Sequence, residues 1–243
     1  MKRQKVRFAV LFISFLLFPI TIFYFSPFLP FMSAKLHIIN GSVIVFLCLI
    51  LGGMFLGRAF CGWIMPCGGI QEVCFSMNNR PVKQSRWDYL KFFIWAVWLG
   101  FLIFFVIKSG GYNKIDFFFG TKHGISIWAF YYYIVYYSVI LLFFISASIF
   151  GKRSVCHYSC WITPFMILGR KMANIIKIPS LRLKKANDNC TQCKLCDKAC
   201  PMSLEVSAMV HSGKMENTEC ILCGSCIDVC KTKTIKFAFT SYR

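Results

Sequence analysis

Eight cysteines near the end of the chain fall into two runs that share one spacing. Both runs read Cys-x2-Cys-x2-Cys-x3-Cys, over residues 190–200 and 220–230, and Pro201 follows the first. A [4Fe–4S] cluster needs four thiolates, and in proteins with two clusters the fourth cysteine of a run ligates the cluster of the other run. The spacing therefore predicts two [4Fe–4S] clusters. The expected ligands are Cys190, Cys193, Cys196 and Cys230 for one cluster, and Cys220, Cys223, Cys226 and Cys200 for the other.

Zinc sites and disulfide bonds are the other common uses of clustered cysteines. Zinc sites typically combine two Cys-x2-Cys pairs, or cysteine with histidine, whereas these runs are cysteine triplets with a fourth member. The triplets favour clusters over zinc. Cluster thiolates also indicate a reducing compartment, so we expect the C-terminal part of the chain to face the cytoplasm.

A second set of cysteines follows two similar apolar segments. Arg58 precedes Cys61 by three residues, Arg153 precedes Cys156 by three, and a further cysteine follows in each loop. The similarity predicts an internal repeat of two helical hairpins whose loops emerge on the same side of a membrane. A third [4Fe–4S] cluster could then bind between the loops, where the two arginines would offset its negative charge and tune its potential. Its expected ligands are Cys61, Cys67, Cys156 and Cys160.

Three other roles for these loop cysteines remain open: apolar filling, zinc binding, or a redox dithiol. We expect Cys48 and Cys74 to pack among apolar side chains, with Cys74 as the reserve ligand. The four histidines do not form a pattern typical of membrane haem. No nucleotide-binding fingerprint or catalytic triad is present, so no catalytic residue is assigned and enzymatic activity is left open.

The composition is that of a membrane protein. Of 243 residues, 57% are hydrophobic and only 15% are charged, against about 25% charged in a typical soluble domain. Four apolar segments, at about 8–32, 38–57, 90–107 and 126–150, are each near the length of about 20 residues that spans a bilayer.

The net charge of +19 does not indicate nucleic-acid binding, because the basic residues lie in loops between apolar segments and at the C-terminal end. They concentrate in the two terminal segments and in the loops expected on the same side of the membrane as the termini. By the positive-inside rule, this distribution predicts a multi-pass protein of the inner (cytoplasmic) membrane with its N- and C-termini in the cytoplasm.

These features predict a membrane α-helical fold with an appended α+β domain. Residues 1–160 would form four transmembrane helices, arranged as two repeated hairpins with two cytoplasmic cysteine loops. Residues 161–186 would form an interfacial amphipathic helix and a linker that begins near Pro179. Residues 187–243 would form the domain that holds two clusters.

The motifs GRAFCGWIMPCGGIQE (residues 57–72), FGKRSVCHYSCWITPF (residues 150–165) and the two cysteine runs give the chain a wider resemblance. Over nearly its whole length it resembles membrane-bound polyferredoxins of the NapH/NosR type. The resemblance implies a four-helix electron carrier with two Cys-x3-Cys-Pro motifs on the cytoplasmic side and a bacterial 2[4Fe–4S] ferredoxin-like domain. This sequence departs from the pattern of that family at two positions. Met65 stands where the second cysteine of the first motif would be, and Trp161 replaces the proline after Cys160.

The resemblance also implies quinol oxidation and delivery of electrons to a partner. We therefore expect an electron-transfer component, such as part of a quinol dehydrogenase complex, that relays electrons between the membrane, with quinone as the candidate reactant, and a redox partner protein. Two alternatives remain: a metal-ion reductase or assembly factor that uses the membrane cysteines, and a redox sensor.

Overall fold

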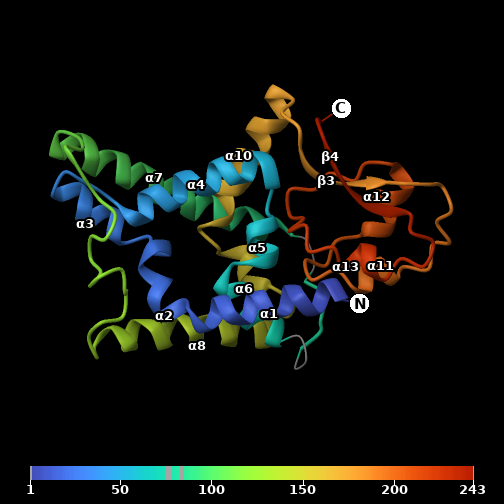
Figure 1. Ribbon diagram of the computed structural model, residues 1–243, viewed down its shortest axis with the longest axis horizontal. Helices are drawn as coiled ribbons and strands as arrows, with labels where there is room; N and C mark the ends of the chain where they lie inside the picture. The colour runs from blue at the N-terminus through green and yellow to red at the C-terminus, as the bar shows by residue number, and fades with distance from the viewer. Residues whose placement is uncertain (1, 75–77, 83–84, 243) are drawn as a thin grey trace.

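Long apolar helices occupy one end of the molecule and a small α/β unit occupies the other (Figure 1). The computed structural model describes residues 2–74, 78–82 and 85–242. The helices are α1 (Lys2–Leu16), α2 (Phe18–Thr21), the 3-10 helix η1 (Ile22–Phe25), α3 (Leu29–Lys35), α4 (Gly41–Leu56), α5 (Ala59–Trp63), α6 (Pro66–Val73), the 3-10 helix η3 (Arg86–Tyr89), α7 (Leu90–Ser109), α8 (Tyr132–Phe150), α9 (Ser154–Tyr158), α10 (Thr163–Ile176), α11 (Leu195–Lys198), α12 (Val206–Ser212) and α13 (Ser225–Asp228). The strands are β1 (Ile38–Asn40), β2 (Lys114–Asp116), β3 (Ser180–Lys185) and β4 (Ile235–Thr240).

Two helical segments in the described part of the chain are long and apolar enough to cross a membrane, Arg86–Ser109 and Tyr132–Phe150. A third is present if Lys2–Leu16 and Phe18–Phe25, which meet at a bend of 58°, form one span. Helix α4 is apolar but has 16 residues. The large side chains of α7 and α8 are mostly exposed, among them Phe104 and Ile107, as expected of a surface that contacts lipid.

The first expected span, residues 8–32, is not one continuous helix. Helix α1 ends at Leu16, and Pro19 lies in the first turn of α2. A proline inside a helix removes one backbone hydrogen bond and clashes with the preceding turn, so the chain bends here. Helix α3, with Pro30 in its first turn, then leads back toward α4.

The two cysteine loops have the same local structure. Helices α4 and α8 end at Gly57 and Gly151, whose φ angles of 55° and 94° glycine adopts without strain. A helix of five residues follows in each case, α5 or α9, and carries a cysteine at its third position. Each loop then enters a helix with proline in its first turn, α6 or α10.

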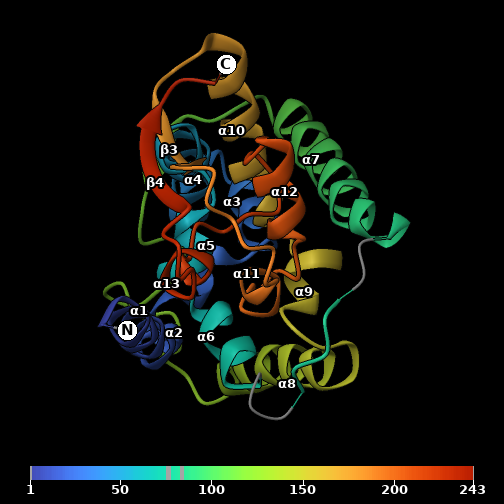
Figure 2. The same cartoon turned by 90° about the vertical axis from the view of Figure 1, so that its right-hand side faces the viewer.

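The third helix of each repeat packs against the long helix of the other repeat. Helix α6 contacts α8, and α10 contacts α4. Helices α4 and α10 approach so closely that their glycines have no room for a side chain. A Cβ on Gly169 would lie 2.0 Å from the carbonyl oxygen of Ile50, and a Cβ on Gly53 would lie 2.6 Å from the carbonyl oxygen of Met166. Seen from the α/β unit, α1 and α8 lie on one side of the helical part, and α4, α7 and α10 lie on the other (Figure 2).

Residues 161–186 differ only in part from the expected interfacial helix and linker. Four apolar residues of α10 stay exposed, as an interfacial helix requires: Leu168, Met172, Ile175 and Ile176. Most of α10 is buried against α4, because the small residues Gly53 and Gly169 let the two backbones meet. The expected linker contains β3, which pairs antiparallel with the C-terminal strand β4 from Ser180 opposite Thr240 to Lys185 opposite Ile235. The α/β unit thus begins at Ser180 rather than at 187.

Candidate iron–sulfur sites

Cys190, Cys193, Cys196 and Cys230 line one cavity of the α/β unit; we call this set the outer site. Cys193 is exposed. A hydrogen bond from the backbone N–H of Leu195 lowers the pKa of the Cys193 thiol. Burial alone would raise the pKa of Cys230, but hydrogen bonds from Thr232 and from backbone N–H groups, including that of Thr234, outweigh it and lower this pKa.

Cys200, Cys220, Cys223 and Cys226 line a second cavity; we call this set the inner site. Its other walls are mainly apolar, with Leu183, Met202 and Leu222 among them. Burial raises the pKa of Cys220 to about 12 and that of Cys200 to about 11. The two sites therefore place chemically identical ligands in different surroundings, one partly hydrated and one shielded.

The two cavities contain the two interleaved sets of cysteines that the spacing predicts. Within the described residues, no three His, Cys, Asp or Glu side chains converge on one point, as ligands of a single ion would. A cubane carries its four thiolates on four separate iron corners, so a space between four thiols suits a cluster. Hydrogen bonds to sulfur, such as the one from the Thr234 N–H to Cys230 at 3.4 Å, also suit a ligated thiolate.

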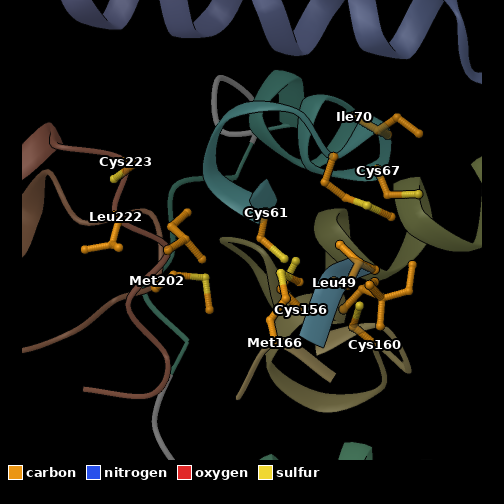
Figure 3. Packing of buried hydrophobic residues seen from close by; sticks show 14 of the residues in the cluster. Leu49, Cys61, Cys67, Ile70, Cys156, Cys160, Met166, Met202, Leu222 and Cys223 are labelled. Atoms are coloured by element: carbon orange, nitrogen blue, oxygen red, sulfur yellow. The ribbon is translucent and has the colours of Figure 1, made fainter. Parts of the chain in front are cut away.

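Cys61, Cys67, Cys156 and Cys160 are all buried in one core between the repeats; we call them the loop site. Cys61 and Cys156 point toward one another in Figure 3, and Cys67 and Cys160 lie farther along the same core. Burial raises the pKa of Cys61 to about 12, although Arg58 acts in the opposite direction. Thiols with such high pKa values stay protonated unless a metal takes the place of the proton.

The departure at Met65 does not remove a thiol from this core. Met65 is buried and immediately precedes α6, and Cys67 is the second residue of that helix. Cys67 is buried in the same core as Cys61, Cys156 and Cys160. Cys74 is also buried, whereas Cys48 is exposed on α4 rather than packed in the interior as expected.

Two buried ion-pair triads flank the loop site. In the first, Glu72 accepts hydrogen bonds from Arg7, at 2.7 and 2.6 Å, and from Arg153. In the second, Glu219 accepts from Arg58 at 2.8 Å and from Lys91 at 2.7 Å. Each triad contains two cations and one carboxylate, so each carries a net charge of +1.

Arg58 and Arg153 thus occupy equivalent places in the two repeats, as the sequence predicts, but each is also paired with a carboxylate. The sequence analysis did not identify Glu72, Glu219, Arg7 or Lys91. Their signal was present in part, because Glu72 ends the first loop motif and Glu219 directly precedes Cys220.

Gln71 is a further site residue that the sequence analysis missed. Its side-chain N–H donates to the sulfur of Cys156 at 3.4 Å and to the carbonyl oxygen of Cys67 at 3.2 Å. The amide therefore connects the backbone of the first repeat at Cys67 with a thiol of the second repeat. A hydrogen bond to a ligating sulfur is one of the means by which a protein sets the potential of a cluster.

The loop site directly adjoins the inner site. A Cβ on Gly62, next to Cys61, would lie 2.3 Å from the carbonyl oxygen of Ile221. The indole N–H of Trp63 donates to the carbonyl oxygen of Leu222 at 3.1 Å. On the other repeat, the ring of His157 lies 3.1 Å from the carbonyl oxygen of Met202. Both cysteine loops are thereby in contact with the chain that surrounds the inner site.

Acid should weaken the attachment of the α/β unit through Glu216. This carboxylate receives hydrogen bonds from Arg170 at 2.7 and 2.9 Å and from Arg182 at 2.9 Å. Burial alone would raise its pKa, but the two arginines outweigh burial and lower the pKa below the ordinary value of 4.5. A depressed folded-state pKa gives stability that is present above pH 4.5 and is lost as the pH falls through the folded-state value. Thermal unfolding between pH 7 and pH 3 should show this loss, and Glu216→Gln should reduce the pH dependence.

Comparison with known proteins adds two family matches. A model described as a 4Fe-4S dicluster domain matches residues 182–231. A model described as a 4Fe-4S binding domain matches two segments, residues 41–83 and 134–179. Each of these two segments contains one long apolar helix and one cysteine loop, so the same model matches both halves of the repeat that the sequence predicts.

The relatives are distant in sequence, but their matches cover most of the chain. An uncharacterized protein of Methanocaldococcus jannaschii is 28% identical over 76% of this chain and 74% of its own length. YccM of Escherichia coli, provisionally named an electron transport protein, is 22% identical over 86% of this chain and 61% of its own length. The ferredoxin-type protein NapH of Haemophilus influenzae is 24% identical over 84% of this chain and 68% of its own length.

No solved structure matches the chain. The family matches and the relatives agree with the two kinds of cysteine motif described above, one in the apolar helical part and one in the α/β unit. Together, the two family models and the relatives YccM and NapH support a NapH-like family of membrane 4Fe–4S polyferredoxins.

Proposed function

We propose that this iron–sulfur electron-transfer protein relays single electrons between the membrane, with a quinone as the reactant there, and a redox partner protein. The outer, inner and loop sites would hold three [4Fe–4S] clusters. When bound, such clusters supply reversible one-electron transfer, while the protein fixes their spacing, burial and hydrogen bonding. The observation that carries the proposal is the direct contact of the loop site with the inner site through Gly62 and Ile221.

The charges around the loop site support a cluster there. The two triads place a total net charge of +2 beside four buried thiols, and a [4Fe–4S]²⁺ core with four thiolates carries about −2. In addition, the Nε atoms of Arg58 and Arg153 are buried without a hydrogen-bond partner among the described residues. A buried donor that lacks a hydrogen-bond partner is costly, so both arginines favour an additional acceptor group between the repeats.

The proposal includes four spans in the cytoplasmic membrane, arranged as two hairpins, with both termini in the cytoplasm. The N-terminal end of α1 and the whole α/β unit lie at the same end of the molecule (Figure 1). Gln4 reaches from α1 to the α/β unit, where it donates to the carbonyl oxygen of Cys223 at 3.1 Å and to Asp228 at 2.6 Å. Helix α4 would be the shortest span, and the glycines that admit α10 suit it to a position inside the bundle.

An apolar cavity beside the loop site suits a quinone. It has a volume of about 580 Å³ and lies between α4 and α5, with Gly52, Phe60 and Trp63 among its lining residues. Pockets for small apolar molecules typically measure about 300–1,000 Å³. Because Phe60 and Trp63 flank Cys61 in α5, a molecule in this cavity would lie next to the loop site.

Iron and sulfide analysis, together with EPR, tests the cluster assignment. Anaerobically purified protein should contain about twelve iron and twelve sulfide ions per chain, and Cys156→Ser should lower both to about eight. The matched control is Cys48→Ser, because Cys48 is exposed on α4 outside the three sites and its loss should leave the iron content unchanged. Unchanged iron in Cys156→Ser would overturn the third cluster. A metal ion held by the loop cysteines without sulfide would favour a metal-ion reductase or assembly factor instead.

A further inference from the structure

Resting on the proposed function, we propose that the outer site is the docking surface for an acidic electron-transfer protein, which Lys194 and Lys231 recognise. An electron lost by one protein is gained by the other, so only a close approach of the two redox sites is required. The partner is defined here by its chemistry: a soluble redox protein with carboxylates around its own cofactor.

The outer site is the more accessible of the two sites in the α/β unit. Cys193 is exposed, and Cys190, Cys196 and Cys230 are partly exposed. The inner site is covered on its membrane side by α5, where Gly62 meets Ile221, and beside it by Gln4 of α1, which binds the carbonyl oxygen of Cys223. Cys220 of the inner site is partly exposed and its other three cysteines are buried, whereas Cys193 of the outer site is exposed. A soluble protein can therefore approach a cluster ligand most closely at the outer site.

The surface of the outer site is positively charged. Lys194 and Lys231 line its cavity and are exposed, and none of the described residues that line the cavity is acidic. Lys233, two residues after Lys231, is exposed as well. The nearest part of the chain therefore presents cations to any protein that approaches Cys193.

The carboxylates near this surface are already engaged within the protein. Asp197 accepts hydrogen bonds from the backbone N–H of Ser207 at 2.7 Å and from its hydroxyl group. Asp228 pairs with Arg3 at 3.3 Å and accepts a hydrogen bond from Gln4. Asp188 pairs with Lys185 at 2.6 Å. Ser207 is neutral, so Asp197 keeps its charge, and the positive charge of this surface comes from the three exposed residues Lys194, Lys231 and Lys233. Exposed cations attract an acidic surface and speed its association at low salt.

A binding experiment with the full chain tests this surface. The protein is placed in nanodiscs of zwitterionic phosphatidylcholine, so that the lipid adds no net charge, and is titrated with an acidic flavodoxin as the probe. Lys194→Glu/Lys231→Glu should weaken binding at low ionic strength by about tenfold or more, and the difference from wild type should disappear at about 0.5 M salt. Binding can be measured whether or not the clusters are present.

The matched control reverses two other exposed lysines of the same unit. Lys184 and Lys236 face each other across β3 and β4, and Lys236 points away from Ile235, which lines the outer site, because side chains alternate along a strand. Lys184→Glu/Lys236→Glu should change binding by less than about twofold. Equal weakening in both variants, or unchanged binding in the first, overturns the proposal.

Iron content and EPR spectra of every variant separate this proposal from the function on which it rests. If the chains contain no clusters, the proposed function fails, whereas the effect of the two lysines on flavodoxin binding can still be read. If clusters are present and binding ignores the charge reversal, the docking surface fails alone. A changed midpoint potential with unchanged binding would show that the lysines act on the cluster rather than on a partner, and it counts against docking.

Discussion

Glu72→Gln should destabilise the folded protein by about 3–5 kcal/mol, which is the usual cost of breaking a buried ion pair from one side. Glu72 has a side-chain exposure of 4% and joins Arg7 of α1 to Arg153 of the second repeat. Glutamine has the same shape but no charge, so two buried guanidinium groups would lose their counterion. The variant should therefore unfold about 10 °C lower than wild type in a thermal scan in detergent.

The control for this prediction is Glu205→Gln, since Glu205 is exposed at the start of α12 and caps no backbone group. It should leave the unfolding temperature within a degree or two of wild type. Adding Arg153→Gln to Glu72→Gln should recover part of the loss, because one uncompensated charge is then removed. An unfolding temperature unchanged by Glu72→Gln would mean that this triad does not hold the repeats together.

Gly62→Ala should disrupt the contact between the loop site and the inner site. The new Cβ would lie 2.3 Å from the carbonyl oxygen of Ile221, and this atom belongs to backbone that cannot rotate away as a flexible side chain can. Overpacking of this kind typically costs about 1–3 kcal/mol. Hydrogen exchange of residues 220–224 should become faster, and reduction of the clusters by a quinol should become slower than in wild type.

The control variant for Gly62→Ala is Gly100→Ala, because a Cβ on Gly100 of α7 meets no atom within 4 Å. That variant should match wild type in both measurements. Dithionite, which reaches the outer site from solution, should reduce Gly62→Ala as fast as wild type. Equal quinol rates in wild type and in Gly62→Ala would falsify the role of this contact in the relay.

The spacing of the cysteines was the most informative part of the sequence. Ligands of one cluster lie mostly within one short loop, so local sequence determines which thiols come together. The two cavities of the α/β unit are lined by the two predicted sets of four, and the match of one family model to both loop segments agrees with the predicted repeat. Which thiols hold each cluster, and how many clusters bind, stay predictions.

The sequence was least informative where distant residues meet. Arg58 and Glu219 are 161 positions apart, and nothing in either neighbourhood specifies the other as partner. An amphipathic pattern shows that α10 has an apolar face but does not distinguish lipid from a neighbouring helix. In the structure Gly169 approaches Ile50 of α4, while Leu168, Met172, Ile175 and Ile176 stay exposed, so α10 packs on a helix with one side only. Similarly, β3 was expected to be a linker because its partner strand lies at the far end of the chain.

The crossed packing of α6 on α8 and of α10 on α4 has a consequence for the origin of the fold. Each half of the helical part uses a helix of the other half to cover its long apolar helix, so neither half would be complete by itself. A forerunner with one copy of the repeat could have closed the same arrangement as a pair of identical chains, each lending its last helix to its twin. Joining the two copies in one gene would then have made that exchange permanent and left each copy free to change, as the unequal positions of Cys67 and Cys160 illustrate.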